Sequence, residues 1–218
     1  DLGSKAPALL GHNEATVNDT YAMVTGPAKS VPDHYNSGEL DFQDGATSIK
    51  YNLLIRAYDS GIALRWVLPP QPGLIDFNVK AEKTQFHFPA DYDCWGANIG
   101  HYNSSFEAEY DETRASRIRN HNLYMAPLVC KTGQGEATFA LAEADKRDYA
   151  GAFFSGRGDG GLGVEVNLSP RIDNSVDVHY NQIAVKAHMP ADGFFTPWRV
   201  VMIGDHPGDL AASNLIPM

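Results

Sequence analysis

The amino-acid sequence predicts an all-β domain of the sandwich class with little helix. Apolar and polar residues alternate with period two in many short runs, turn-forming residues separate these runs, and hardly any segment suits a buried helix. The chain has 218 residues, 43% of them hydrophobic, with 20 glycines and 13 prolines. This apolar content is sufficient for a folded core, and the turn residues are typical of short strands. Both features favour a sandwich over a helical bundle.

Candidate strands follow one another along the chain. The clearest pair is Ile49–Ala57 and Ile62–Leu68, because both runs alternate and Gly61 can adopt the positive φ that a tight hairpin needs. Runs bounded by Gly, Pro, Asp or Asn predict further strands. These are Gly38–Phe42, Thr84–Phe88, Ser105–Tyr110, Ala126–Val129, Ala137–Ala144, Gly163–Asn167, Ser175–Val185 and Trp198–Ile203.

Other segments are interpreted as surface or connecting structure. Glu107–Arg119 has the length of a helix, but its apolar positions are too sparse for a buried stripe. The acidic cluster Asp41–Asp44 is predicted to be a solvated strand end and turn. The sequence shows no composition break or repeat, so we expect a single domain over residues 1–218.

Composition excludes some classes of partner. The formal net charge of −10 disfavours a nucleic acid or an anionic membrane, whereas a neutral sugar is compatible with it. No run approaches the roughly 18 apolar residues that a membrane-spanning helix needs. Cys94 and Cys130 have no metal-ligand spacing and are too few for a disulfide framework, so they are predicted to be unpaired thiols.

Few motifs indicate catalysis. The glycine-rich Gly156–Gly163 lacks the Lys-Ser/Thr end of a phosphate loop and is interpreted as a hairpin loop. The eight histidines are scattered without a metal-ligand pair. At the end of the predicted strand Ala137–Ala144, Glu143 lies beside Asp145 and Asp148, where a carboxylate can face a site and bind a hard cation such as calcium. The spacing alone favours the alternative, an ordinary charged strand end.

Three motifs occur in an order that resembles one known family. They are the hairpin segment Asp59–Trp66, the segment Leu141–Asp145 with Tyr149 nearby, and the closing stretch "TPWRVVMIGDHPGDLAASNL". The stretch that begins at Val17 is also similar. Together they resemble the N-terminal domain of glycoside hydrolase family 97, over most of the chain.

The resemblance implies a fold and a place in a larger enzyme. Members are secreted or periplasmic bacterial α-glycosidases, including calcium-dependent α-glucosidases and α-galactosidases. They have an N-terminal β-supersandwich that resembles the galactose-mutarotase fold, followed by a (β/α)8 barrel and a small β-domain. Residues 1–218 are therefore expected to be an incomplete N-terminal domain, with strands missing ahead of Asp1 and with residues 207–218 leading toward an absent barrel.

The same resemblance implies which site residues to expect. Glycoside hydrolysis needs two carboxylates held a fixed distance apart, and in the family both lie on the barrel. We therefore assign no catalytic residue here and no substrate-binding residue. Glu143 matches a family glutamate that reaches from the N-terminal domain to the calcium. The sequence departs from the family at Ala142, Trp66 and Ser37, which leaves the sugar specificity open.

Two alternatives belong to other functional classes. A free-standing carbohydrate-binding module would stack sugars on Trp66, Trp95 or Trp198, although tryptophans of this kind are more often buried. A mutarotase-like epimerase would need a general acid and a general base in one cleft. In the leading interpretation the partners are the enzyme's own barrel and an α-linked oligosaccharide. Without the barrel, the surface that would contact it is exposed, and an exposed apolar surface favours self-association.

Overall fold

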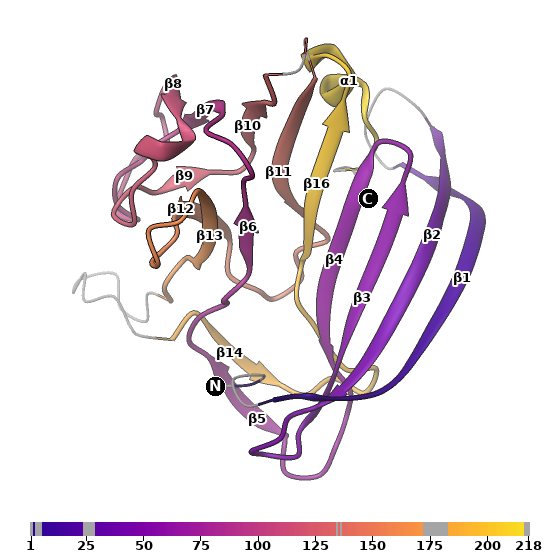
Figure 1. Cartoon of the computed structure of the whole chain (residues 1–218). Coiled ribbons are helices and arrows are strands. Elements are labelled where there is room, and N and C mark those ends of the chain that lie inside the picture. The colour runs from indigo at the N-terminus through magenta and orange to yellow at the C-terminus, as the bar shows by residue number, and fades with distance from the viewer. Residues whose placement is uncertain are drawn as a thin grey trace.

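The structure is a computed structural model that describes residue 2 and residues 6–23, 29–133, 135, 137–171 and 183–215. These residues form an antiparallel β-sandwich with one short helix, α1 (Pro207–Ala212), and one turn of 3-10 helix, η1 (Ala115–Arg117). A large, curved sheet runs along one side of the molecule, and smaller sheets cover part of it (Figure 1). The all-β prediction is therefore confirmed.

The large sheet contains ten strands, with the order β1-β2-β3-β4-β16-β11-β10-β7-β8 and β15 paired to β4. Each strand of this sheet runs antiparallel to the strand with which it pairs. Its strands are β1 (Ala8–Ala22), β2 (Ser30–Gln43), β3 (Lys50–Tyr58), β4 (Gly61–Leu68), β7 (Asp93–Ala97), β8 (Tyr110–Arg114), β10 (Leu128–Lys131), β11 (Thr138–Ala144), β15 (Phe194–Phe195) and β16 (Trp198–Gly204).

Two smaller sheets complete the fold. One has the order β6-β13-β12-β9, and the other pairs β14 with β5. Their strands are β5 (Asp76–Val79), β6 (Gln85–His87), β9 (Tyr124–Met125), β12 (Ala152–Gly156), β13 (Gly163–Leu168) and β14 (Val185–His188). The main core lies between the four-stranded sheet and the half of the large sheet around β10 and β11, where Leu128, Leu141 and Phe154 are almost fully buried.

The predicted hairpin is confirmed as β3 and β4. Gly61 has a φ of +153°, and a Cβ at this position would lie 2.2 Å from the carbonyl oxygen of Val201. The glycine therefore allows β16 to approach the hairpin closely. The glycine-rich Gly156–Gly163 also forms the predicted loop, between β12 and β13. The predicted strand Ser175–Val185 lies mostly outside the described residues.

Some strand predictions were shifted or missed. The run Ser105–Tyr110 is not a strand, and β8 begins only at Tyr110. No strand was predicted for β1, because most of its residues are exposed and polar, so that neither face shows a hydrophobic alternation. β12 was missed for the opposite reason, since all its residues are buried.

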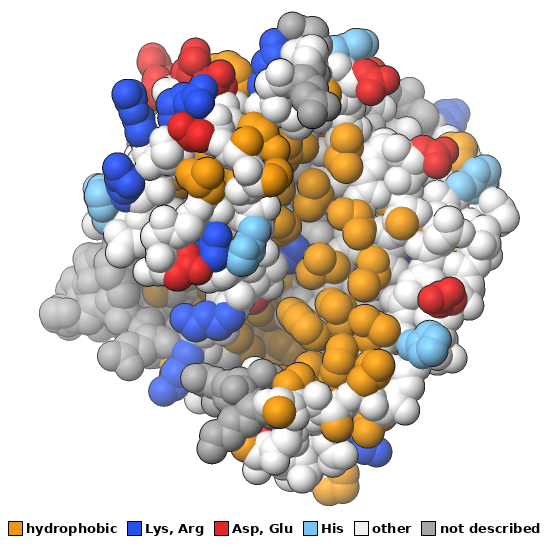
Figure 2. Space-filling view, viewed as in Figure 1, with side chains coloured by type: hydrophobic (Ala, Val, Ile, Leu, Met, Phe, Trp, Pro, Cys, Tyr) orange, Lys and Arg blue, Asp and Glu red, His pale blue; other side chains and the backbone are white. Residues whose placement is uncertain are grey.

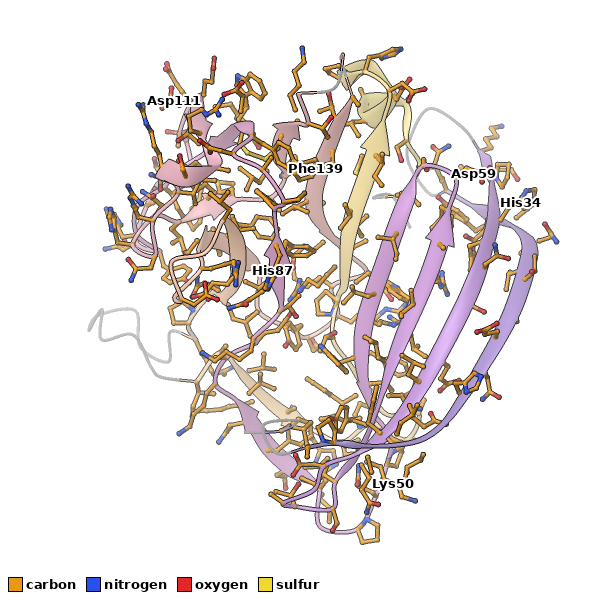
Figure 3. The ribbon with its side chains drawn as sticks, viewed as in Figure 1. His34, Lys50, Asp59, His87, Asp111 and Phe139 are labelled. Carbon is orange, nitrogen blue, oxygen red and sulfur yellow. A yellow bond between two sulfur atoms is a disulfide. The ribbon has the colours of Figure 1, made fainter. Side chains whose placement is uncertain are left out.

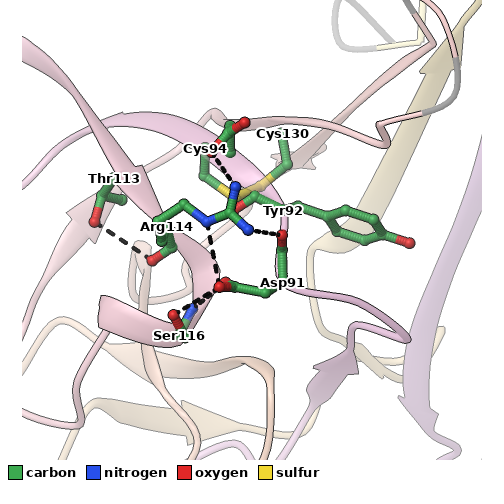
Figure 4. The surroundings of a disulfide bond; sticks show 8 residues. Asp91, Tyr92, Cys94, Thr113, Arg114, Ser116 and Cys130 are labelled. Carbon is green, nitrogen blue, oxygen red and sulfur yellow. Dashed lines mark hydrogen bonds and ion pairs between the residues drawn. A yellow bond between two sulfur atoms is a disulfide. The ribbon is translucent and has the colours of Figure 1, made fainter.

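The cysteine prediction was wrong, because Cys94 and Cys130 form a disulfide. They are direct partners in the register of β7 and β10, both are fully buried, and their Cα atoms lie 4.0 Å apart. Two cysteines 36 residues apart gave no sign of this pairing until the strand register was known. Beside the disulfide, Arg114 binds Asp91 and Asp93 on the surface (Figure 4).

The acidic cluster also differs from its prediction at one residue. Asp44 is 1% exposed, and its Oδ2 accepts hydrogen bonds from the backbone N–H groups of Ala46 and Thr47 and from the Thr47 hydroxyl. The carboxylate thus closes the turn between β2 and β3, a role that short acidic side chains fill well. Asp44 is a structural residue of the turn, whereas Asp41 is only half-buried.

An apolar patch lies on the part of the large sheet that the four-stranded sheet leaves uncovered. Residues paired across strands share one face, and Val201, which packs against the main core, pairs with Ile62. Leu64 pairs with Ile55 on the same face. Ile62 and Ile203 remain 36% and 54% exposed. Figure 2 shows the hydrophobic side chains as a continuous band through the centre of this view.

Candidate functional site

Glu143 lies near the end of β11, directly opposite Arg199 of β16. It is the only acidic residue of its strand, and its neighbours Ala142 and Ala144 point to the opposite, buried face. The strand alternation therefore directs the Glu143 side chain to the face that carries the main core, at the end of the sheet where the core stops. Its side chain is 16% exposed.

A buried ion-pair network holds Glu143. Arg199 is 1% exposed, and its Nη1 donates to Glu143 Oε2 over 2.9 Å. Its Nε and Nη2 donate to the two carboxylate oxygens of Glu82, over 2.8 and 2.5 Å. Glu82 lies between β5 and β6, and it also accepts a hydrogen bond from the Thr84 hydroxyl over 2.7 Å. Two carboxylates therefore share one guanidinium.

The protonation of this network follows from its surroundings. Burial alone would lower the pKa of Arg199, but the hydrogen bonds and charge of Glu82, together with the charge of Glu143, raise it above its ordinary value. Burial raises the pKa of Tyr149, and the negative charge of Glu82 raises it further. Tyr149 donates its hydroxyl proton to Glu82 Oε2 over 3.4 Å. Near neutral pH, Arg199 is thus a cation and Tyr149 a neutral donor.

The two oxygens of Glu143 have different environments. Oε2 accepts hydrogen bonds from Arg199 and from the backbone N–H of Ala152, the latter over 3.2 Å. Oε1 lies 3.7 Å from Nζ of Lys146, a side chain that is 48% exposed. A Cβ on Gly151 would lie 3.8 Å from Oε1, in ordinary contact. Gly151 and Lys146, the neighbours of Oε1, line a surface hollow of about 790 Å³, although Glu143 is not itself a lining residue.

The neighbouring carboxylates do not join Glu143. The two oxygens of Asp145 are bound to Arg65 and Arg147, over 3.0 and 2.6 Å. Asp148 is exposed, and both aspartates have positive φ values, of +51° and +43°. Among the residues that the structure describes, no group of three His, Cys, Asp or Glu side chains is placed to hold a metal ion. Glu143 offers one oxygen donor of the type that calcium binds, in an incomplete set.

Of the three tryptophans, Trp198 is too buried to form an open stacking platform. Trp198 is 6% exposed and lies between two guanidinium groups, those of Arg56 at 4.7 Å and Arg65 at 4.3 Å from its ring. Trp66 is half-buried and packs edge-on against Tyr51. Trp95 is half-buried on β7. Trp198 therefore belongs to the core, as its more common role in β-proteins predicts.

The histidines that the structure describes lie on different strands and loops. Those that the structure describes are all exposed. Figure 3 shows His34 at the outer edge of the molecule and His87 near the middle of the view, well apart from each other, while Phe139 of β11 points into the space between the sheets. The Phe139 ring packs against Phe88, with centroids 5.3 Å apart. No two described histidines are paired with each other as an acid and a base.

Sequence reasoning missed Arg199 and Glu82. Arg199 interrupts an otherwise apolar strand, and a charged residue in such a run indicates a buried partner. That signal was available, although it did not identify Glu82, which is 117 residues away. Glu82 becomes the partner of Arg199 because the fold places the segment between β5 and β6 next to β16.

These observations define an all-β sandwich domain in which the Glu143 carboxylate, fixed by its ion pair with Arg199, lies near the end of a central strand. The chain belongs to the family described as Glycosyl-hydrolase 97 N-terminal, whose profile matches residues 2–218. It is 27% identical over 223 aligned residues to a retaining alpha-galactosidase of Bacteroides thetaiotaomicron, covering 95% of this chain and 32% of that protein. A probable retaining alpha-galactosidase of Streptomyces bingchenggensis is 26% identical, with 93% and 28% coverage.

Solved structures share the fold. A glycoside hydrolase family 97 enzyme from Pseudoalteromonas sp. strain K8, in complex with acarbose, superposes with a TM-score of 0.76 at 24% identity, covering 96% of this chain and 29% of that one. A beta-arabinopyranosidase superposes with a TM-score of 0.73 at 22% identity, covering 92% of this chain and 32% of that one. The chain thus spans about a third of the length of these relatives.

Proposed function

We propose that this chain is the non-catalytic N-terminal domain of a calcium-dependent α-glycosidase that acts on α-linked oligosaccharides, and that Glu143 supplies one calcium ligand. The observation that carries the proposal is the open oxygen of Glu143. Oε2 is engaged by two donors, whereas Oε1 has one ionic neighbour among the described residues, the half-exposed Lys146 that lines the hollow. Calcium takes about six to eight oxygen ligands, so the others would come from the remainder of the enzyme. The ion, when bound, would polarise substrate oxygens.

Calcium titration tests this assignment. The chain alone is expected to bind calcium only in the millimolar range or more weakly, because it fixes a single carboxylate. In the full-length enzyme, Glu143→Gln is expected to weaken calcium binding and to reduce activity, since the ion loses a charge and a positioned oxygen. Isothermal titration calorimetry measures the binding, and a hydrolysis assay measures the activity.

A matched control is Glu165→Gln, since Glu165 is a half-buried carboxylate of β13 that binds Gln85 and Gly158 and has no place at the hollow. Glu143→Gln keeps an acceptor oxygen for Arg199 and Ala152, so its thermal midpoint should change little. Micromolar calcium binding to the chain alone, abolished by Glu143→Gln, would show that the site is complete within this domain.

A second prediction concerns catalysis. The chain alone is expected not to hydrolyse aryl α-glucosides or aryl α-galactosides, with or without calcium, because glycoside hydrolysis needs two carboxylates across the anomeric carbon. A chromogenic assay at high protein concentration measures this. Turnover that is lost on mutation of a residue in this chain would contradict the proposal.

The apolar patch supports a further part of the proposal. The curated relatives are about three times as long as this chain, and an exposed apolar surface of this kind marks an interaction site. We propose that the patch of Ile55, Ile62, Leu64, Val201 and Ile203 packs against the remainder of the enzyme.

No helix among the described residues is long and apolar enough to cross a membrane.

Self-association of the isolated chain follows from this assignment. The chain is expected to form dimers or larger species, since Ile62 and Ile203 of the patch are exposed, and Ile62→Asp is expected to shift the population toward monomer. Sedimentation velocity over a range of concentrations measures both. Ile75→Asp is the control, because Ile75 is 60% exposed but precedes β5, away from the patch. A wild-type chain that stays monomeric at high concentration would exclude the idea.

We also propose that the enzyme is secreted or periplasmic. The Cys94–Cys130 disulfide supports this, because disulfides form and persist in oxidising compartments and are rare where glutathione keeps thiols reduced.

A further inference from the structure

The buried network around Arg199 contains two carboxylates for one guanidinium. Glu82 and Glu143 both bind one guanidinium, so these three side chains carry a net charge of −1, which among the described residues is offset only from the surface, by the half-exposed Lys146 at 3.7 Å from Oε1 of Glu143. Burying a carboxylate costs free energy unless it is well paired, and a half-exposed lysine at this distance compensates Glu143 only weakly. The arrangement therefore calls for a function beyond packing.

Arg199 donates more hydrogen bonds to Glu82 than to Glu143. Glu82 receives two parallel hydrogen bonds, from Nε and Nη2, which is the strong bidentate arrangement. Glu143 receives only one, from Nη1, and only on Oε2. If Glu143 were the sole partner, the guanidinium would bind both of its oxygens and neutralise it. Glu82 occupies the bidentate side instead, and Oε1 of Glu143 remains outside the network.

The orientation of Glu143 is fixed as well. Oε2 lies between Arg199 and the Ala152 N–H, so rotation of the carboxylate is blocked on that side. Arg199 itself is 1% exposed and cannot move into solvent. The contacts of Glu82 with Thr84 and Tyr149 hold the other end of the network.

We propose that Arg199 and Glu82 are positioning residues. Arg199 orients the Glu143 carboxylate with Oε1 toward the hollow. Glu82 neutralises the positive charge of Arg199, so that the negative charge of Glu143 is available to bind a cation. This inference depends on the proposed function, because it names the residues that prepare Glu143 for calcium. Neither residue touches the ion.

The test uses calcium chloride titrations of the full-length enzyme and three variants. Glu82→Gln keeps size and hydrogen bonding but removes one charge, so calcium affinity is expected to fall at least tenfold, the effect of one charge within about 12 Å of the ion at an effective dielectric constant of about 20. Arg199→Lys keeps the charge but loses the planar fork, and a loss of similar size is expected. Glu165→Gln is the matched control, because it makes the same charge change at a half-buried carboxylate of β13 that binds Gln85 and Gly158 outside the network, and its affinity should stay within about twofold.

A double-variant cycle separates orientation from general disturbance. In the Glu143→Gln background, Arg199→Lys should no longer change calcium affinity, because no ligand carboxylate remains to be oriented. An equal loss in both backgrounds would overturn the inference, since the effect would then bypass Glu143. Circular dichroism verifies that each variant folds. Glu82→Gln and Arg199→Lys perturb the network separately, so the inference can still be tested if one of them fails to fold.

The outcomes also separate this inference from the proposed function. If Glu143→Gln weakens calcium binding while Glu82→Gln and Arg199→Lys leave it unchanged, the inference is wrong and the proposed function stands. If Glu143→Gln itself leaves calcium binding unchanged, the proposed function is wrong and the inference is wrong with it.

Discussion

Replacing Arg199 by methionine is expected to lower the free energy of unfolding by about 3–5 kcal/mol, because it leaves the Glu82 carboxylate buried without its cation. The Glu82 side chain is only 5% exposed, so water cannot take the place of the guanidinium. Its remaining hydrogen bonds come from Thr84 and Tyr149 and carry no full positive charge. Urea unfolding followed by tryptophan fluorescence measures the loss.

Two controls identify the cause. The double variant Glu82→Gln/Arg199→Met is expected to recover most of the loss, since a neutral buried pair no longer needs a counterion. Arg114→Met removes an arginine that also binds two carboxylates, Asp91 and Asp93, but at the surface, and its effect should be much smaller. A single variant as stable as wild type would mean that Glu82 finds other compensation.

Reducing the Cys94–Cys130 disulfide is expected to lower the free energy of unfolding by about 3–4 kcal/mol, the chain-entropy value for a loop of this length. For a chain of this size, that corresponds to a fall in the thermal midpoint on the order of 10 °C. Both sulfur-bearing residues are fully buried, so reduction should require partial unfolding. Thermal unfolding with and without reductant after an unfolding and refolding cycle measures the difference.

The variant Cys94→Ala/Cys130→Ala is the control, because its midpoint should not respond to reductant. A midpoint of the wild-type chain that is equally insensitive, with both thiols shown to be free by alkylation, would contradict the pairing.

The sequence predicted those parts of the fold in which local pattern and environment agree. β3 and β4 have a clear alternation and a glycine at the turn, so the hairpin was correct. β1 lies at the sheet edge with both faces exposed, and β12 is buried on both faces, so neither shows a period of two. The disulfide was missed because it depends on the register of β7 and β10, which no local pattern encodes.

The candidate site was predictable only to its first residue. Glu143 stood out because a carboxylate ends an apolar strand and because the surrounding motif resembles a family. Its partner Arg199 comes from β16, 56 residues away along the chain, and Glu82 comes from the distant segment before β6. Asp145 and Asp148 were closer in sequence, yet Asp145 is directed to Arg65 instead. Distance along the chain was a poor guide, because β-sheets bring distant segments together.

The position of β16 has a consequence for how the chain acquires its fold. The large sheet consists of one half made from residues 8–68 and another made from residues 93–144, and β16 lies between β4 and β11 as the strand that connects them. The hairpins of the first half can form as soon as they are synthesised, but their edge stays unpaired until residues 198–204 emerge. Proteins dominated by such non-local pairing fold in milliseconds to seconds. During that interval the unpaired edges are prone to aggregation, so chaperone protection during synthesis should raise the yield of this domain.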